Sequence, residues 1–166
     1  MSLLRSSAAA LSLLAVLSSP SAQPAPVIAR ASGPFEITII PAGPPEKEGR
    51  TATARMALDK RYVGELAASG KGTMLTAVSD TKGSAAYVAI ERVSGTLAGR
   101  KGGFVLQHAG TMHGGTSQAL ITIVPDSGTG ELSGISGTLV LTVVDGQHFY
   151  ALAYVLDPVL DHALKN

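Results

Sequence analysis

The apolar residues of this chain gather in short blocks that suit β-strands rather than helices. Branched and aromatic side chains form short runs, and Gly, Asp and Ser residues separate these runs. No segment shows the helical period, apart from the start of the chain and its last few residues. The pattern predicts strands at residues 31–40, 51–62, 66–79, 85–97, 104–112, 116–124, 132–144 and 147–156.

The clearest strand pair is predicted at residues 83–115, where two apolar runs flank a group of glycines. Glycine can take the positive φ that a chain reversal requires. If the turn centres on residues 99–101 with an even-numbered loop, Glu91 and His108 lie on one face of the hairpin. Arg92 and Gln107 then lie on the other face. A one-residue bulge at the paired glycines would exchange these partners.

Turn signals and prolines predict how the strands are connected. Asp145-Gly146 is typical of a two-residue hairpin turn. No proline lies between residues 46 and 124, an interval compatible with continuous strand pairing. Residues 41–49, PAGPPEKEG, are predicted to form a solvent-exposed loop. The regular succession of hairpins favours an up-and-down barrel or a sandwich.

The start of the chain has the features of a secretory signal peptide. Arg5 supplies a positive charge, residues 8–17 are apolar, and residues 18–22 are small side chains suited to cleavage. The apolar run is shorter than the roughly 20 residues that a membrane-spanning helix needs. We therefore expect export to the periplasm or the cell exterior, without stable membrane insertion once the signal is removed. The expected division is 1–22 signal peptide, 23–30 extended leader, 31–157 β-barrel domain and 158–166 C-terminal tail.

Composition narrows the class of protein further. The chain contains no cysteine, so an exported domain must be held together by its core alone. Removal of Arg5 with the signal leaves 12 basic and 12 acidic residues from the initial 13 and 12. This balance gives no electrostatic attraction to phosphate backbones, so nucleic acid is not expected as a partner.

Several predicted strands are apolar on both faces. In the run TLVLTVV, Leu139 and Leu141 point one way while Val140 and Val144 point the other. A barrel with a solvated exterior alternates more strictly between apolar and polar residues. The excess predicts that another subunit or residues 158–166 cover part of the outside, and we favour a homo-oligomer.

Two blocks of sequence stand out, AIERVSGTLAGRKGGFVLQHAGTMHGG and VPDSGTGELSGISGTL, and the FVLQH and SGTGEL segments within them are the most specific. These blocks resemble a bacterial domain family of unknown function with an allene-oxide-cyclase-like barrel fold. The resemblance covers residues 31 to 157. It implies an eight-stranded antiparallel up-and-down barrel, often with a cavity, and it brings no settled activity.

Glu91 and His108 are the candidate catalytic residues. Inside an apolar barrel, desolvation would raise the pKa of the carboxyl group while a nearby imidazolium would lower it, and such a pair can transfer protons near neutral pH. Outside the barrel, the same two residues would form only a cross-strand charge pair. For Arg92 and Gln107 the alternatives are a structural hydrogen bond and an anion-orienting role.

The aromatic and apolar neighbours of this pair are candidate ligand-binding residues. Tyr87 shares the predicted face of Glu91, and Phe104 and Leu106 share that of His108. If the face is interior, the cavity is apolar with a small polar patch, which is typical of a small-molecule pocket. If it is exterior, these residues would lie in a subunit contact.

Metal and cofactor motifs are not found in the sequence. His108 and His113 are five residues apart and fall on opposite faces of an unbroken strand, which argues against a shared metal site. Residues 64–72, GELAASGKG, lack the spacing and the following helix of a phosphate loop. We expect neither a metal nor a cofactor.

Three classes of function remain. The first, which we favour, is a binding module for a small hydrophobic molecule inside the barrel. The second is an isomerase or cyclase that uses Glu91 and His108 as acid and base on a small apolar substrate. The third is a structural or partner-binding barrel with a filled core. In the first two classes, Glu91→Gln and His108→Ala should disturb a ligand site more than the fold.

Overall fold

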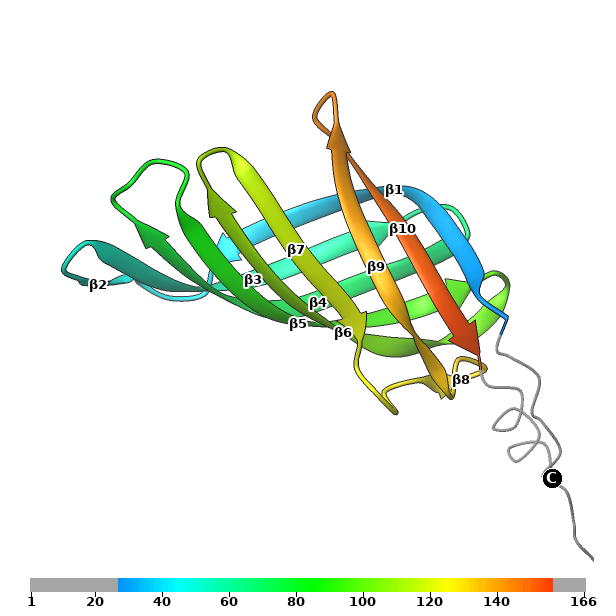
Figure 1. Ribbon diagram of the computed structural model, residues 1–166. Coiled ribbons are helices and arrows are strands. Elements are labelled where there is room, and N and C mark those ends of the chain that lie inside the picture. Colours follow the sequence, from blue (N-terminus) through cyan, green and yellow to red (C-terminus); the bar gives the residue numbers. More distant parts are fainter. Residues whose placement is uncertain (1–26, 157–166) are drawn as a thin grey trace, which may run out of the picture.

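The computed structural model describes residues 27–156 (Figure 1). This part of the chain contains ten strands, joined by turns and loops, and no helix. None of these residues therefore belongs to a helix able to cross a membrane. The eight long strands are β1 (Ala29–Pro41), β3 (Thr51–Tyr62), β4 (Leu66–Ser79), β5 (Ala85–Leu97), β6 (Arg100–His113), β7 (Thr116–Ile123), β9 (Ile135–Val144) and β10 (Gln147–Leu156). Two short strands, β2 (Glu46–Glu48) and β8 (Thr129–Gly130), attach to β3 and β6.

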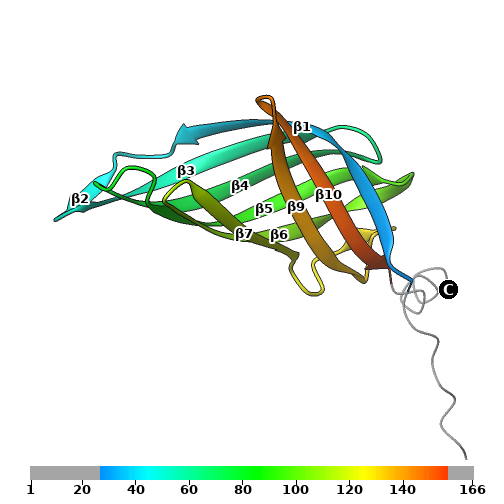
Figure 2. The same ribbon diagram turned by 45° about the horizontal axis from the view of Figure 1, so that its top comes forward.

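The long strands pair in sequence order, and β1 closes the sheet into a barrel (Figure 2). The first half of β1 pairs with β10 and the second half with β3, and Phe35 is the residue at which the two pairings meet. All of these pairings are antiparallel. The predicted eight-stranded up-and-down barrel is thus confirmed.

One seam of the barrel is much weaker than the others. Between β7 and β9 the only residue pair is Thr122 with Thr138, whereas β9 and β10 pair along their whole length. From this point β7 and β9 diverge towards one end of the barrel (Figure 1). We call this end the open end, and the end that contains the turn between β5 and β6 the closed end.

In the β5–β6 hairpin Glu91 and His108 share a face as predicted, but the turn lies at residues 98–99 instead of 99–101. The two turn residues, Ala98 and Gly99, both have positive φ, 49° and 81°. Glu91 pairs with Leu106 and Ala89 pairs with His108, so Glu91 and His108 lie on the same face of the hairpin. The Asp145-Gly146 turn joining β9 and β10 also has positive φ at both residues, 50° and 78°, as the sequence predicts.

Some boundaries differ from the prediction because glycines act as strand residues. Strand β6 begins at Arg100 instead of residue 104, so Gly102 and Gly103 lie in the ladder and pair with β8. A side chain at Gly102 would overlap the carbonyl oxygen of Thr129. Glycine is needed here for close backbone approach rather than for the turn.

Two other segments also depart from the predicted boundaries. Strand β9 begins at Ile135 instead of residue 132, because the preceding residues form turns, with the Leu132 N–H donating to Thr129 O at 3.1 Å. The expected loop at residues 41–49 carries the short exposed strand β2. Ala29 and Arg30, assigned to the leader, belong to β1, while the signal peptide and C-terminal tail lie outside the described residues.

The closed half of the barrel is filled by large side chains. Alternate residues of each strand point inward, as strand geometry requires. The most deeply buried of them include Leu66, Leu97, Phe104, Leu106, Ile121, Leu132, Ile135 and Leu152.

The outer surface of the barrel also carries apolar residues. Directly paired residues on four neighbouring strands form one row, made up of Leu75, Val88, Ala109 and Leu120. Leu75, Val88 and Leu120 are more than half exposed, as are Val140 and Val144 on β9.

Tyr150 connects β10 to the turn between β3 and β4. Its ring packs edge-on against Tyr62 with centroids 5.4 Å apart. Its hydroxyl group donates to the Val63 carbonyl at 3.2 Å and accepts from the Leu66 N–H at 2.9 Å. Tyr150 is 2% exposed and Leu66 is 1% exposed, so the Leu66 N–H has little access to water.

We predict that Tyr150→Phe lowers the free energy of unfolding by about 1–3 kcal/mol, because it leaves a buried N–H and a carbonyl without their partner. Urea denaturation measures the change. Tyr154→Phe is the matched control, since Tyr154 is 6% exposed and its hydroxyl group has no hydrogen bond within residues 27–156. Equal destabilisation by both variants would contradict the role given to the Tyr150 hydroxyl.

Candidate functional site

Three ionisable side chains meet inside the barrel, halfway along its length. Lys60 points inward from β3, Glu91 from β5 and His108 from β6, and they are 3%, 0% and 3% exposed. Charged residues are almost never buried to this extent unless they are paired. Together with Tyr62, which contacts Glu91, they form the buried charge cluster.

Glu91 is the centre of the buried charge cluster. The Lys60 ammonium donates to Glu91 Oε2 at 2.7 Å, and the Tyr62 hydroxyl group donates to Oε1 at 2.8 Å. His108 Nε2 lies 3.0 Å from Oε2, but the contact is outside hydrogen-bond geometry. The carboxylate also depends on Gly70, where any side chain would overlap Oε1.

The environment keeps Glu91 ionised and Tyr62 neutral. Burial raises the pKa of Glu91, but the contact with His108 and the attraction of Lys60 outweigh it, so the pKa lies below its ordinary value of 4.5. Burial, and then the negative charge of Glu91, raise the pKa of Tyr62 far above its ordinary value. The cluster is therefore a carboxylate held by a lysine, a phenol and an imidazole.

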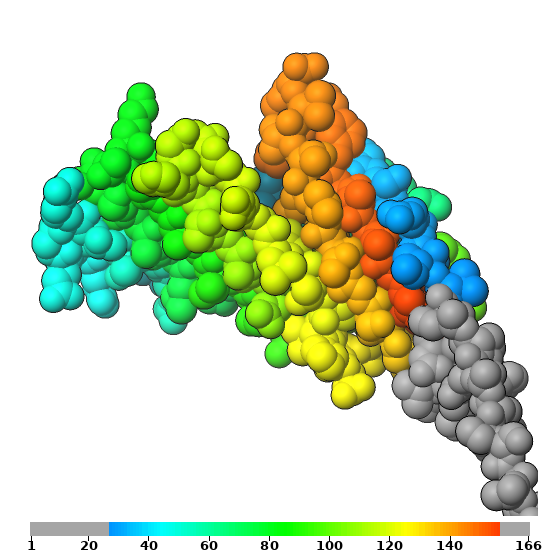
Figure 3. All heavy atoms as spheres, viewed as in Figure 1, coloured from blue at the N-terminus to red at the C-terminus, as the bar shows by residue number. Residues whose placement is uncertain are grey.

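A cavity of about 490 Å³ lies on the open-end side of the buried charge cluster. Lys60 and His108 belong to its wall, whereas Glu91 and Tyr62 do not. Its lining residues are Ile37, Ile39, Leu58, Lys60, Met74, Thr76, Val78, Ala85, Ala86, Tyr87, Ala89, His108, Met112, Leu141, Val143 and His148. They include no acidic residue and no residue of β7, and Figure 3 shows a deep notch between β7 (yellow-green) and β9 (orange).

The structure brings together three of the residues singled out from the sequence. Glu91 and His108 share the interior, which is the arrangement on which the acid–base hypothesis depends. Tyr87 lines the cavity, and burial raises the pKa of its hydroxyl group. Its ring lies against Gly110, where a side chain would overlap it.

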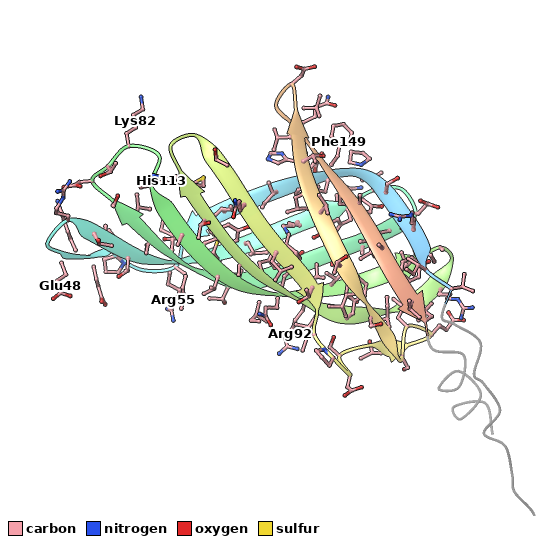
Figure 4. The ribbon with its side chains drawn as sticks, viewed as in Figure 1. Glu48, Arg55, Lys82, Arg92, His113 and Phe149 are labelled. Carbon is pink, nitrogen blue, oxygen red and sulfur yellow. The ribbon has the colours of Figure 1, made fainter. Side chains whose placement is uncertain are left out.

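The other four residues lie elsewhere, and their proposed ligand contacts need correction. Arg92 and Gln107 point outward and are exposed, because they alternate with Glu91 and His108 along the strands, and Figure 4 shows Arg92 projecting from the outer surface. Phe104 and Leu106 do point inward, at 2% and 0% exposure, but they pack in the filled half and do not line the cavity.

Sequence reasoning missed Lys60 and Tyr62. The signal was present in the segment MALDKRY, where Leu58, Lys60 and Tyr62 alternate with charged or small residues. A lysine that shares a strand face with a leucine and a tyrosine predicts an inward charge, and that charge requires an acid. The described residues contain no group of three or more acidic or imidazole side chains suited to a metal ion.

We predict that Lys60→Met lowers the free energy of unfolding by about 3–5 kcal/mol, because it leaves the Glu91 carboxylate buried without its cation. The double variant Lys60→Met/Glu91→Gln should recover most of this loss. Urea denaturation of the wild type, both single variants and the double variant gives the coupling energy. Additive losses would contradict a buried ion pair.

The same reasoning revises the expectation for Glu91→Gln. This variant should affect the fold as well as the cavity, because it leaves Lys60 without its acidic partner.

Acid should weaken the barrel through Glu91. Because the folded-state pKa is lowered, the contribution of Glu91 to stability is complete above its ordinary pKa of 4.5 and is lost as the pH falls through the folded-state value. We expect the wild type to lose stability below pH 4.5 more steeply than Lys60→Met/Glu91→Gln does. Equal pH dependence of the unfolding free energies from pH 7 to pH 3 would contradict this.

Comparisons with known proteins agree with this fold. A family described as "Protein of unknown function (DUF3224)" matches residues 31–154. A crystal structure of a protein of unknown function from the DUF3224 family of Shewanella oneidensis MR-1 superposes with a TM-score of 0.72 and 42% sequence identity. The match covers 80% of this chain and 100% of that one. No curated protein matches the sequence. The chain described here, a closed antiparallel β-barrel, belongs to the DUF3224 family.

Proposed function

We propose that this protein binds a small apolar molecule in the open half of its barrel. The observation that carries the proposal is the cavity of about 490 Å³, which lies within the size range of small-molecule sites. Its wall is mostly apolar. Lys60 and His108 form its floor, by which we mean the end of the cavity next to the buried charge cluster. This combination favours an apolar ligand held in one orientation.

The purely structural alternative fits the barrel less well. Large side chains fill the closed half, but the open half is lined by small residues such as Ala85 and Ala89. Protein interiors leave few voids larger than a water molecule. A barrel selected only for stability would carry larger side chains at these positions.

An isomerase or cyclase is the second candidate, and the contact between His108 and Glu91 favours it. His108 reaches the cavity and Glu91 lies behind it at 3.0 Å. In this role His108 would exchange a proton with the substrate, while Glu91 would orient the imidazole and stabilise its protonated form. Glu91 would then be a positioning residue rather than the acid or base itself.

We propose two further features on the basis of sequence and surface. The signal peptide features at residues 1–22 support binding outside the cytoplasm. The exposed row from Leu75 to Leu120 and the apolar outer residues of β9 support a homo-oligomer.

The cavity can be tested with N-phenyl-1-naphthylamine, an uncharged apolar probe whose fluorescence rises on transfer from water. We expect the wild type to bind it and Ala89→Leu to bind it at least ~10-fold more weakly, because the added side chain fills the floor of the cavity. Ala151→Leu is the control, since Ala151 is exposed on the outside of β10. Unchanged binding by a folded Ala89→Leu variant would show that the probe binds elsewhere, and no binding by the wild type would sink the proposal.

A further inference from the structure

We propose that the cavity takes an amphiphile with one carboxylate head group, which lies against Lys60 and His108 while its apolar body fills the open half of the barrel. The inference rests on the proposed function and specifies the class of ligand. Its basis is the orientation of the buried charge cluster relative to the cavity.

The cluster presents its basic side to the cavity and its acidic side to the core. Lys60 and His108 line the cavity, whereas Glu91 is 0% exposed and lies behind them. No aspartate or glutamate lines the remainder of the wall. A ligand that reaches the floor therefore meets two nitrogen bases before it meets any carboxylate. This asymmetry favours an anionic head group over a cationic one.

The two basic residues also have unused hydrogen-bonding capacity. The Lys60 ammonium has three N–H donors, and its two hydrogen bonds go to Glu91 and, at 3.3 Å, to the Tyr62 hydroxyl group. His108 Nε2 is buried and has no hydrogen-bond partner, although Glu91 lies near it. Buried polar atoms without a partner are rare, and each calls for an explanation. His108 Nε2 faces Glu91 rather than the cavity, so the head group would be bound through the third N–H of Lys60, with the His108 ring beside it.

Charge balance supports the same class of ligand. Two potential cations, Lys60 and His108, surround the single carboxylate of Glu91. A carboxylate head group would make the number of acidic groups at the cluster equal to the number of basic ones. Charge-assisted hydrogen bonds between such groups are about twice as strong as neutral ones. The neutral part of the ligand would contact residues nearer the mouth, such as Ile39, Met112 and Val143.

The test compares two ligands that share an apolar chain and differ in the head group. Dodecanoate and 1-dodecanol compete with N-phenyl-1-naphthylamine for the wild-type protein at neutral pH. We expect both to displace the probe, with dodecanoate binding at least ~10-fold more tightly. Equal affinities would overturn the head-group inference and leave the cavity proposal intact. Failure of the probe and of both ligands to bind would overturn the cavity proposal as well.

Variants then locate the source of the preference. In Lys60→Met/Glu91→Gln, which removes both members of the ion pair, we expect the preference for dodecanoate to fall to ~2-fold or less while 1-dodecanol binds as before. His108→Gln should also reduce the preference. Arg92→Gln is the control, because it removes one positive charge from the outer surface and should leave the preference unchanged. A preference that persists in the double variant, or that disappears in Arg92→Gln, would refute recognition by the buried charge cluster.

Discussion

The carboxylate of Glu91, buried at the middle of the barrel, is the interaction on which the rest of the structure depends. Moving an ion out of water costs several kcal/mol, and only close partners with good geometry offset that cost. Lys60 and Tyr62 on β3 provide hydrogen-bonding partners at 2.7 and 2.8 Å, and His108 Nε2 on β6 lies 3.0 Å from the carboxylate. Because they come from both sides of β5, the carboxylate fixes the alignment of four neighbouring strands. Gly70 on β4, between β3 and β5, leaves the space that it occupies.

The buried charge cluster also separates two halves of the interior with different packing. Towards the closed end, Phe104 and Leu106 on β6 fill the space. Towards the open end, the inward positions after His108 are Gly110 and then Met112, which lines the cavity near its opening. The seam between β7 and β9 lies beside the hollow half and has a single residue pair. Local opening at such a seam breaks few backbone hydrogen bonds. The weakest part of the wall therefore lies beside the hollow half of the barrel.

The strands and their register could be predicted from the sequence because local chemistry determines them. Turns with two residues of positive φ, such as Asp145-Gly146, fix the pairing of the strands they join, and the same effect placed Glu91 and His108 on one face. The pairing of Gly102 with β8 could not be predicted, since Gly130 lies in a separate segment of the chain. Nor could the sequence distinguish Leu106, in the filled half, from Tyr87, at the cavity. The two residues differ in their position along the barrel axis. The alternation of apolar and polar residues shows which face a side chain is on, but not how far along the barrel it lies.

Small residues at particular strand positions account for the hollow half of the barrel. Ala89 lies directly opposite His108 in the ladder, and both residues line the cavity. Gly110 lets the ring of Tyr87 lie against the wall instead of across the space. A larger apolar side chain at Ala89 would bury more apolar surface, as the large residues of the closed half do. Because the residue opposite His108 is an alanine, the cavity extends down to the wall that Lys60 and His108 form.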